Sequence, residues 1–212
     1  MLQDITKLFV FLLPQIMFSV SARAQFAPRV DSNKLDVTIL YESLCPDSIR
    51  FMSKQLAPSY GKLNANLNVN LVPFGKSRSV NYGSEFYCQH GPAECSGNRL
   101  QTCVLSQEST QDQRVRFAIC QMVTRDKQNV DECTDQVGLN NDISNCVDTA
   151  LGTQLQLMAE HVTQQYSPSF VPTIVYDGVF NQQLQDASLN DFFGTVCGLL
   201  QKRGIVNEAC SE

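Results

Sequence analysis

Residues 36–48 of this 212-residue chain read DVTILYESLCPDS, a run of β-forming side chains that leads into a cysteine. Valine, threonine, isoleucine and tyrosine in residues 36–42 predict a buried strand. Cys45 follows that strand, and Pro46 and Asp47 suit the first turn of a helix, because proline fits its first position and a carboxylate favours its positive end. The sequence therefore places Cys45 at a strand-to-helix junction.

The next residues predict the rest of a β-α-β unit. A helix is expected over residues 49–60, with Gly61 as its stop. Its apolar side chains at helical spacing are Ile49, Met52 and Leu56. Residues 67–74 alternate apolar and polar side chains, which is typical of a strand. Residues 36–74 are thus expected to form strand, helix and strand in that order.

Beyond this unit the chain predicts a long, mostly helical insertion. Residues 75–100 are polar and contain glycine and cysteine, which indicates a loop, and residues 104–128 are moderately helical. Residues 143–165 carry a stronger apolar stripe, interpreted as the core face of a helix that Ser167-Pro168 breaks. The stripe consists of Cys146, Val147, Ala150, Leu151, Leu155, Met158 and Val162.

The C-terminal part predicts a strand, a turn and a helix. Residues 174–176 are β-forming, and Asp177-Gly178 is a strong hairpin signal. Residues 188–191 resemble a capping box that opens a final helix. Its inward side chains are expected to be Phe192, Phe193, Val196, Leu199 and Leu200. The predicted fold is α/β: a β-α-β unit, a helical insertion over about residues 76–168, a β-hairpin and a terminal helix.

The N-terminus predicts a cleaved signal peptide over residues 1–24. Lys7 precedes an apolar run, and Ala22-Arg23-Ala24 has the small-x-small pattern of a cleavage site. A membrane anchor is the alternative, but the run is shorter than the roughly 18–20 apolar residues that a span needs. Residues 25–212 are then expected to be one secreted domain without a membrane span, and a lysosomal or endosomal lumen is the alternative location.

The nine cysteines are the most informative part of the composition. In an exported chain most of them should be paired, and an odd number leaves at least one free or bonded to another molecule. A zinc site on Cys88, Cys95 and Cys103 is disfavoured, because no Cys-x-x-Cys pair occurs and the chain is exported. No metal is expected, and the net charge of −5 gives no basic footprint for nucleic acid.

Cys45 is expected to be a reactive thiol. At a helix start, unpaired N–H groups and the positive helix end favour the thiolate, which is the nucleophile in disulfide exchange. A further disulfide partner is the alternative, against which the position after a strand, Pro46 and the odd number of cysteines argue. A cysteine protease would need Cys45 beside His90 or His161, and no other pattern supports one.

Val171-Pro172-Thr173 stands directly before the last predicted strand. Proline cannot donate to a sheet ladder, so it belongs at the start of a strand. Together with the Cys45 junction it resembles the thioredoxin superfamily. In that superfamily a cis proline here faces the reactive cysteine, and the backbone beside it, at Val171, holds the substrate chain. A trans proline that starts an edge strand is the alternative.

Residues 88–103 carry a more specific resemblance. They fit the signature Cys-Gln-His-Gly-x-x-Glu-Cys-x-x-Asn-x-x-x-x-Cys of the gamma-interferon-inducible lysosomal thiol reductase family, called GILT, at all eight defined positions. The matching residues are Cys88, Gln89, His90, Gly91, Glu94, Cys95, Asn98 and Cys103. With Cys45 and Pro172 in order, the resemblance covers about residues 34–205.

The resemblance implies a thioredoxin-like fold with a disulfide-rich helical insertion and the reduction of protein disulfides without a bound cofactor. It makes Cys88, Cys95 and Cys103 disulfide partners and places Gly91 in a tight turn. His90 either tunes a thiolate at Cys45 or, as we favour, satisfies backbone hydrogen bonds. The expected partners are protein substrates or protein ligands.

The site departs from the family's Cys-x-x-Cys, because Cys45-Pro46-Asp47-Ser48 ends in serine. Ser48 does not form a disulfide, but its hydroxyl could donate a hydrogen bond to a Cys45 thiolate. Without Cys45, eight cysteines remain for four disulfides. Cys197 and Cys210, which flank the terminal helix, are an expected pair, and the other connectivities stay open. The cysteines outside the signature also include Cys120, Cys133 and Cys146.

Three functions compete. A monothiol oxidoreductase or isomerase would act through Cys45, with an external small thiol to resolve the mixed disulfide. A non-catalytic secreted protein would use the fold to bind another protein, and a covalent trap would hold partners on Cys45. The missing second cysteine predicts weak or absent dithiol reductase turnover. No Asn-x-Ser/Thr sequon occurs, which favours plain secretion over a glycan-based route to lysosomes.

Overall fold

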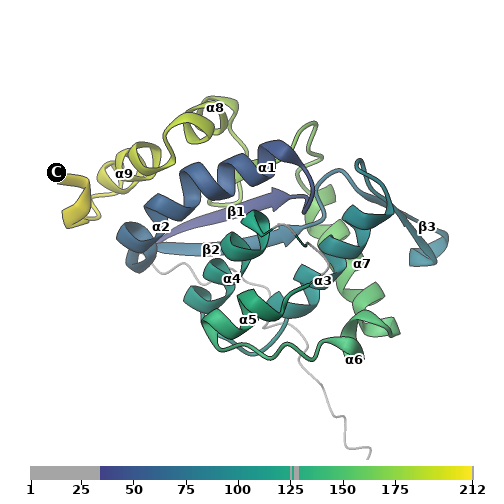
Figure 1. The fold of residues 1–212 in the computed structure, drawn as a ribbon. Coiled ribbons are helices and arrows are strands. Elements are labelled where there is room, and N and C mark those ends of the chain that lie inside the picture. The colour runs from purple at the N-terminus through teal and green to yellow at the C-terminus, as the bar shows by residue number, and fades with distance from the viewer. Residues whose placement is uncertain (1–33, 125, 127–128, 212) are drawn as a thin grey trace, which may run out of the picture. The chain divides into compact units, whose positions relative to one another are not determined.

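The computed structural model describes residues 34–124, 126 and 129–211, whose arrangement is drawn in Figure 1. The predicted signal peptide and its cleavage site lie outside the described residues. Across the part of the chain that is described, no helix combines the length and the apolar composition that crossing a membrane requires.

Strand β1 (Leu35–Tyr41) is the centre of a sheet with the order β2-β1-β5. Strand β2 (Leu67–Pro73) runs parallel to β1, and β5 (Thr173–Tyr176) runs antiparallel to it. A parallel pair needs a crossover connection, which here is the helix that the sequence predicted. The β-α-β unit over residues 36–74 is therefore confirmed, and all of β5 is buried against β1.

The crossover helix runs without interruption through α1 (Pro46–Phe51), a π-helical segment η1 (Met52–Leu56) and α2 (Ala57–Leu63). A 3-10 turn, η2 (Asn64–Asn66), then leads into β2. The predicted stop at Gly61 is wrong. A glycine costs about 1 kcal/mol inside a helix, and the burial of Leu63 beyond it offsets that cost.

The principal core lies between the sheet and this helix. Phe51 of α1 meets Phe192 edge to face, with the ring centroids 5.5 Å apart. Figure 1 shows α8 (Gln182–Asn190) and α9 (Phe192–Lys202) alongside α1 and α2. The predicted inward face of the terminal helix is confirmed, because Phe192, Val196 and Leu200 are buried and Phe193 and Leu199 pack against the same core.

Residues 75–100 are not the loop that the sequence predicted. They form β3 (Arg78–Val80), a 3-10 turn η3 (Asn81–Gly83), β4 (Glu85–Tyr87) and the start of α3 (Pro92–Leu105). The two three-residue strands pair with each other and are too short and polar to produce an apolar period. Gly91, with φ of +83°, turns the chain into α3, and Pro92 occupies the first helical turn.

The insertion continues as a set of helices. They are α4 (Gln111–Val123), α5 (Asp131–Val137), α6 (Ser144–Val147) and α7 (Ala150–Gln164). In the moderately helical stretch predicted at residues 104–128, the structure has the end of α3, a short connection and α4, which ends at Val123, while residues 125, 127 and 128 lie outside the described part of the chain. A reciprocal capping box between Thr110 and Gln113 starts α4.

The apolar stripe predicted over residues 143–165 is only partly a core face. The stretch breaks into α6 and α7, and the side chains of Leu151 and Met158 are about half exposed, at 47% and 52%. The buried face of α7 instead consists of Gly152, Gln156, Ala159 and Thr163. Small side chains let α7 approach α3 closely, and Gln156 donates to Thr102 Oγ1 at 2.6 Å.

The predicted β-hairpin is reduced to its turn. Asp177 and Gly178 both have positive φ, as the turn requires, but the returning chain makes a single bridge, between Tyr176 and Val179, and α8 follows. The capping box predicted at residues 188–191 is also wrong. Ser188 is buried within α8, whereas Asp191 alone caps α9 by accepting from the Gly194 N–H. The last described element is a 3-10 turn, η4 (Glu208–Ser211).

Candidate functional site

Cys45 is the N-cap residue of α1, and three residues separate it from the end of β1. Its backbone is extended, with φ of −65° and ψ of 120°, and Pro46 follows in the first helical turn. The Cys45 N–H donates to the Glu42 carbonyl at 3.3 Å, and the Cys45 carbonyl accepts from the Ile49 N–H at 3.0 Å. Asp47 is exposed and pairs with Arg50 at 3.0 Å.

Cys45 is the one free cysteine among the described residues. The eight others form the disulfides Cys88–Cys95, Cys103–Cys146, Cys120–Cys133 and Cys197–Cys210. The expected pairing of Cys197 with Cys210 is therefore present. The Cys45 side chain is 6% exposed, and its Sγ lies 3.7 Å from the Val171 carbonyl oxygen, to which the thiol donates.

The Val171–Pro172 peptide bond is cis and stands opposite Cys45. Gln185, fully buried on α8, holds this segment from behind. Its side-chain N–H donates to the Pro172 carbonyl at 2.9 Å, and its side-chain oxygen accepts from the Ile174 N–H at 2.7 Å. The structure thus brings Cys45, Val171 and Pro172 together, and it adds Gln185, which sequence reasoning missed.

Ser48 lies one helical turn after Cys45 and is fully buried. Its Oγ accepts a hydrogen bond from the Glu42 N–H at 3.4 Å. The Cys45 thiol donates to the Val171 carbonyl, so the hydrogen bond that the Ser48 hydroxyl could donate to a Cys45 thiolate stays a prediction. Ser48 therefore bonds the backbone at Glu42, where the loop to Cys45 begins, and it provides no second thiol.

Glu42 is a buried carboxylate at the start of that loop. It accepts from the Lys76 N–H at 2.7 Å, from the Ser77 hydroxyl at 3.5 Å and from the Gln89 side-chain amide. Burial raises the pKa of Glu42, and the negative charge of Glu94 raises it further. The hydrogen bonds from Gln89 and Lys76 and the nearby His90 act in the opposite direction on this pKa.

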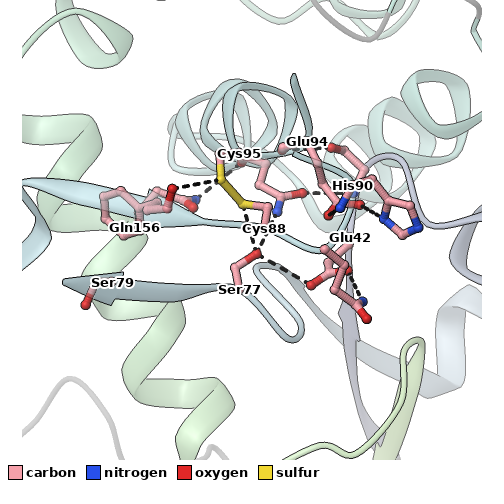
Figure 2. Close-up of a disulfide and its surroundings, with 12 residues drawn as sticks. Glu42, Ser77, Ser79, Cys88, His90, Glu94, Cys95 and Gln156 are labelled. Atoms are coloured by element: carbon pink, nitrogen blue, oxygen red, sulfur yellow. Dashed lines mark hydrogen bonds and ion pairs between the residues drawn. A yellow bond between two sulfur atoms is a disulfide. The ribbon is translucent and has the colours of Figure 1, made fainter. Parts of the chain in front are cut away.

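The signature segment, which we define as residues 88–103, packs against the same loop. Asn98 Oδ1 accepts from the Ser43 N–H at 2.8 Å, and the Glu94 carbonyl accepts from the Ser43 hydroxyl at 3.1 Å. Figure 2 shows Ser77 between the Cys88–Cys95 disulfide and Glu42, with bonds toward both. The sequence pointed to the signature but gave no signal for these contacts.

His90 faces Glu94. Its ring Nδ1 lies 2.7 Å from one oxygen of the buried Glu94 carboxylate, and the backbone N–H of His90 donates to the other oxygen at 3.0 Å. The favoured interpretation of a ring that satisfies backbone groups is therefore wrong, because the ring's partner is a carboxylate. Within the described residues no contact joins Cys45 to His90 or to His161, which is exposed on α7.

Glu42, His90 and Glu94 bring potential ligand atoms within 4.8 Å of one another. Each of their four carboxylate oxygens already accepts a hydrogen bond, from Lys76, Ser77, Gln89 or His90. These oxygens thus belong to a hydrogen-bond network that joins Glu42 to the signature residues His90 and Glu94.

Comparison with known proteins identifies relatives that share the name of one family. The family model described as gamma interferon inducible lysosomal thiol reductase (GILT) matches residues 36–137. The chain is 32% identical to a gamma-interferon-inducible lysosomal thiol reductase-like protein of Anopheles gambiae, over 78% of this chain and 76% of that protein. It is 31% identical to GILT-like protein 1 of Drosophila melanogaster, over 77% and 74% of the two chains.

The structure resembles a disulfide bond oxidoreductase, DsbG, of Mycobacterium tuberculosis. The TM-score is 0.57 at 11% identity, over 90% of this chain and 88% of that one. A likeness at this identity concerns the fold alone, and it confirms the predicted thioredoxin-like architecture. Helices α3 to α7 and three of the four disulfides lie within residues 76–168, in agreement with the disulfide-rich helical insertion expected there.

Proposed function

We propose that this chain, which belongs to the gamma-interferon-inducible lysosomal thiol reductase (GILT) family, performs thiol–disulfide exchange through Cys45 alone. The observation that carries the proposal is the placement of one free thiol at the start of α1, opposite the Val171 carbonyl and the cis Pro172. The thiolate form of a free cysteine is the nucleophile that attacks disulfides.

The proposed reaction begins when the Cys45 thiolate attacks one sulfur of a protein disulfide. A bond forms between Cys45 and that sulfur, the substrate S–S bond breaks, and the other substrate sulfur leaves as a thiolate that takes up a proton. In a dithiol enzyme a second cysteine would then displace the substrate. Ser48 occupies that place here, so its hydroxyl leaves the mixed disulfide intact.

Resolution then requires a thiol from outside the site. A small thiol that attacks the mixed disulfide restores the Cys45 thiol and leaves with the substrate sulfur as a new disulfide, which a second thiol reduces. Alternatively, the substrate's own free thiol attacks, and the result is isomerisation without net reduction. We therefore expect weak or absent turnover as a dithiol reductase.

The test compares the wild type with Ser48→Cys and Cys45→Ser in reduction of a protein disulfide by a small thiol, near pH 5 and near pH 7. We expect slow turnover in the wild type, at least tenfold faster turnover in Ser48→Cys because the second thiol resolves the intermediate, and none in Cys45→Ser. Equal rates in wild type and Ser48→Cys would refute the account of the missing step.

A second candidate is a non-catalytic binding protein or a covalent trap. The limited exposure of Cys45, at 6%, and the serine at position 48 favour this alternative. A trap predicts a mixed disulfide that survives gel electrophoresis without reductant and disappears in Cys45→Ser. A binding protein predicts that Cys45→Ser leaves partner binding intact.

We further propose that the protein works in the secretory pathway, either outside the cell or in a lysosomal or endosomal lumen. Four disulfides suit an oxidising compartment, and residues 1–24 have the pattern of a signal peptide. N-terminal sequencing of protein from culture medium and from lysosomes would locate it, and the expected first residue is Gln25.

A further inference from the structure

The loop that carries Cys45 has few interactions of its own. Residues 42–45 lie between the end of β1 and the start of α1, so neither ladder nor helix supplies all partners for their N–H groups. The Cys45 N–H bonds within the loop, the Glu42 N–H bonds Ser48, and the Ser43 N–H bonds Asn98. One partner thus comes from a segment 55 positions along the chain.

Three residues of the signature segment contact this loop. Asn98, fully buried, accepts from the Ser43 N–H, and the Glu94 carbonyl accepts from the Ser43 hydroxyl. Gln89 donates its side-chain amide to the Glu42 carboxylate. The same carboxylate also anchors Lys76 and Ser77, so the loop is held from two directions.

We propose that Gln89, Glu94 and Asn98 are positioning residues, which hold residues 42–45 so that the Cys45 thiol stays against the Val171 carbonyl. The inference rests on the proposed function, since positioning matters where Cys45 reacts. It also assigns a role to the signature beyond its disulfides: the Cys88–Cys95 bond closes the short segment that presents Gln89 and Glu94. Figure 2 shows Glu42, His90 and Glu94 gathered beside this disulfide.

The contact between Glu42 and Gln89 offers the sharpest test. Gln89→Glu adds a further carboxylate against Glu42, besides that of Glu94, and replaces an attraction with repulsion. Glu94 and His90 are the other ionisable side chains that face Glu42, and the Lys76 contact uses its backbone N–H. The double variant Glu42→Gln/Gln89→Glu restores a complementary pair, because the new amide at position 42 donates to the new carboxylate at position 89.

The measurement is the rate at which iodoacetamide alkylates Cys45 in the native protein near pH 7.5. Because the thiol is 6% exposed, loosening the loop should raise this rate. We expect an increase of about tenfold for Gln89→Glu, about twofold for Glu42→Gln, and a return to within about twofold of wild type for the double variant. Additive increases in the double variant would overturn the proposal.

A second pair of variants separates positioning from general stability. Asn98→Leu removes the acceptor of the Ser43 N–H, whereas Gln156→Met removes a comparably buried amide that bonds Thr102 and the Asn98 carbonyl. We expect similar losses of melting temperature in both, but faster alkylation only in Asn98→Leu, by about tenfold. Equal alkylation in the two variants would show a merely structural role.

The rate of mixed-disulfide formation with a peptide disulfide, measured on the same variants, tests the proposed function separately. If the wild-type protein forms no mixed disulfide, the proposed exchange chemistry is refuted. The alkylation rates would still test whether the signature residues position Cys45. If both hold, Gln89→Glu should alkylate faster but form the mixed disulfide more slowly, and the double variant should reverse both changes.

Discussion

Gly75 lies where three parts of the site meet. Its φ is +57°, and a Cβ built on it would lie 2.6 Å from Glu42 Cγ and 2.8 Å from Val171 Cγ1. Gly75→Ala therefore strains the backbone and pushes the two segments that flank Cys45. We expect a loss of about 1–3 kcal/mol in the free energy of unfolding, measured in urea, together with altered alkylation of Cys45.

Gly61 provides the matched control for Gly75. It lies inside the crossover helix, and a Cβ on it would meet no atom within 4 Å. Gly61→Ala should raise the free energy of unfolding by about 0.5–1 kcal/mol, because alanine favours the helix. Destabilisation by both substitutions to the same degree would contradict this account of Gly75.

Glu42 makes stability depend on pH with a defined sign. Its pKa is raised in the folded protein above the usual value, chiefly by burial, so the folded state binds the proton more tightly than the unfolded chain does. Its contribution to stability is therefore most favourable below the unfolded pKa and declines as pH rises through the folded pKa. The Glu42→Gln variant lacks this decline.

The check is a series of melting temperatures for wild type and Glu42→Gln from pH 4 to pH 7.5. The difference, variant minus wild type, should grow as pH rises, since the variant buries no charge at neutral pH. A difference that stayed constant with pH would mean that Glu42 does not titrate in this range.

Whether a single site residue could be predicted from the sequence depends on whether local propensity or a motif marks it. The junction at Cys45 and the proline at Pro172 were predictable, because local propensity and motif spacing mark both. Gln185 was missed, and Asn98 was identified only as part of the signature. A polar side chain carries no sequence signal for the backbone group that it bonds, which lies 55 positions away for Asn98 and 13 and 11 positions away for Gln185. Burial in the folded protein is what makes those two side chains part of the site.

Whether a helix or strand could be predicted from the sequence depends on whether its apolar side chains repeat with a clear period. The β1–α1–β2 unit was predictable because its apolar residues bury against one core and repeat with a clear period. The β3–β4 pair was missed because strands of three residues have no period to detect. The apolar stripe was wrongly predicted to be the core face of α7 for a different reason. Close packing through Gly152 and Ala159 turns small side chains inward and leaves Leu151 and Met158 exposed.

The disulfides are expected to contribute unequally to the stability of the whole molecule. Cys103–Cys146 closes a segment of 43 residues and joins α3 to α6, whereas Cys88–Cys95 spans seven. By loop entropy, replacing the first pair with serines should cost about 4 kcal/mol and replacing the second about 2.5 kcal/mol. Urea unfolding without reductant measures both.

The two pairs should also differ at the site. Loss of Cys88–Cys95 frees the segment that presents Gln89, so Cys45 alkylation should become faster although the stability loss is smaller. Loss of Cys103–Cys146 should leave the alkylation rate close to wild type at temperatures where the protein remains folded. The reverse order would indicate that global stability alone governs access to Cys45.

The confinement of three disulfides to residues 88–146 has a consequence for the conditions in which the protein can work. Any small thiol concentrated enough to regenerate Cys45 is also a reagent that attacks the protein's own bridges. Cys103 and Cys133 are nearly inaccessible, which shields two of these bridges, while Cys88–Cys95 is only partly covered. The sheet and its crossover helix contain no bridge at all among the described residues. Among these three bridges, a rising supply of reductant would therefore first open the one that borders the site, so the level of the co-substrate itself would limit how long the site stays assembled.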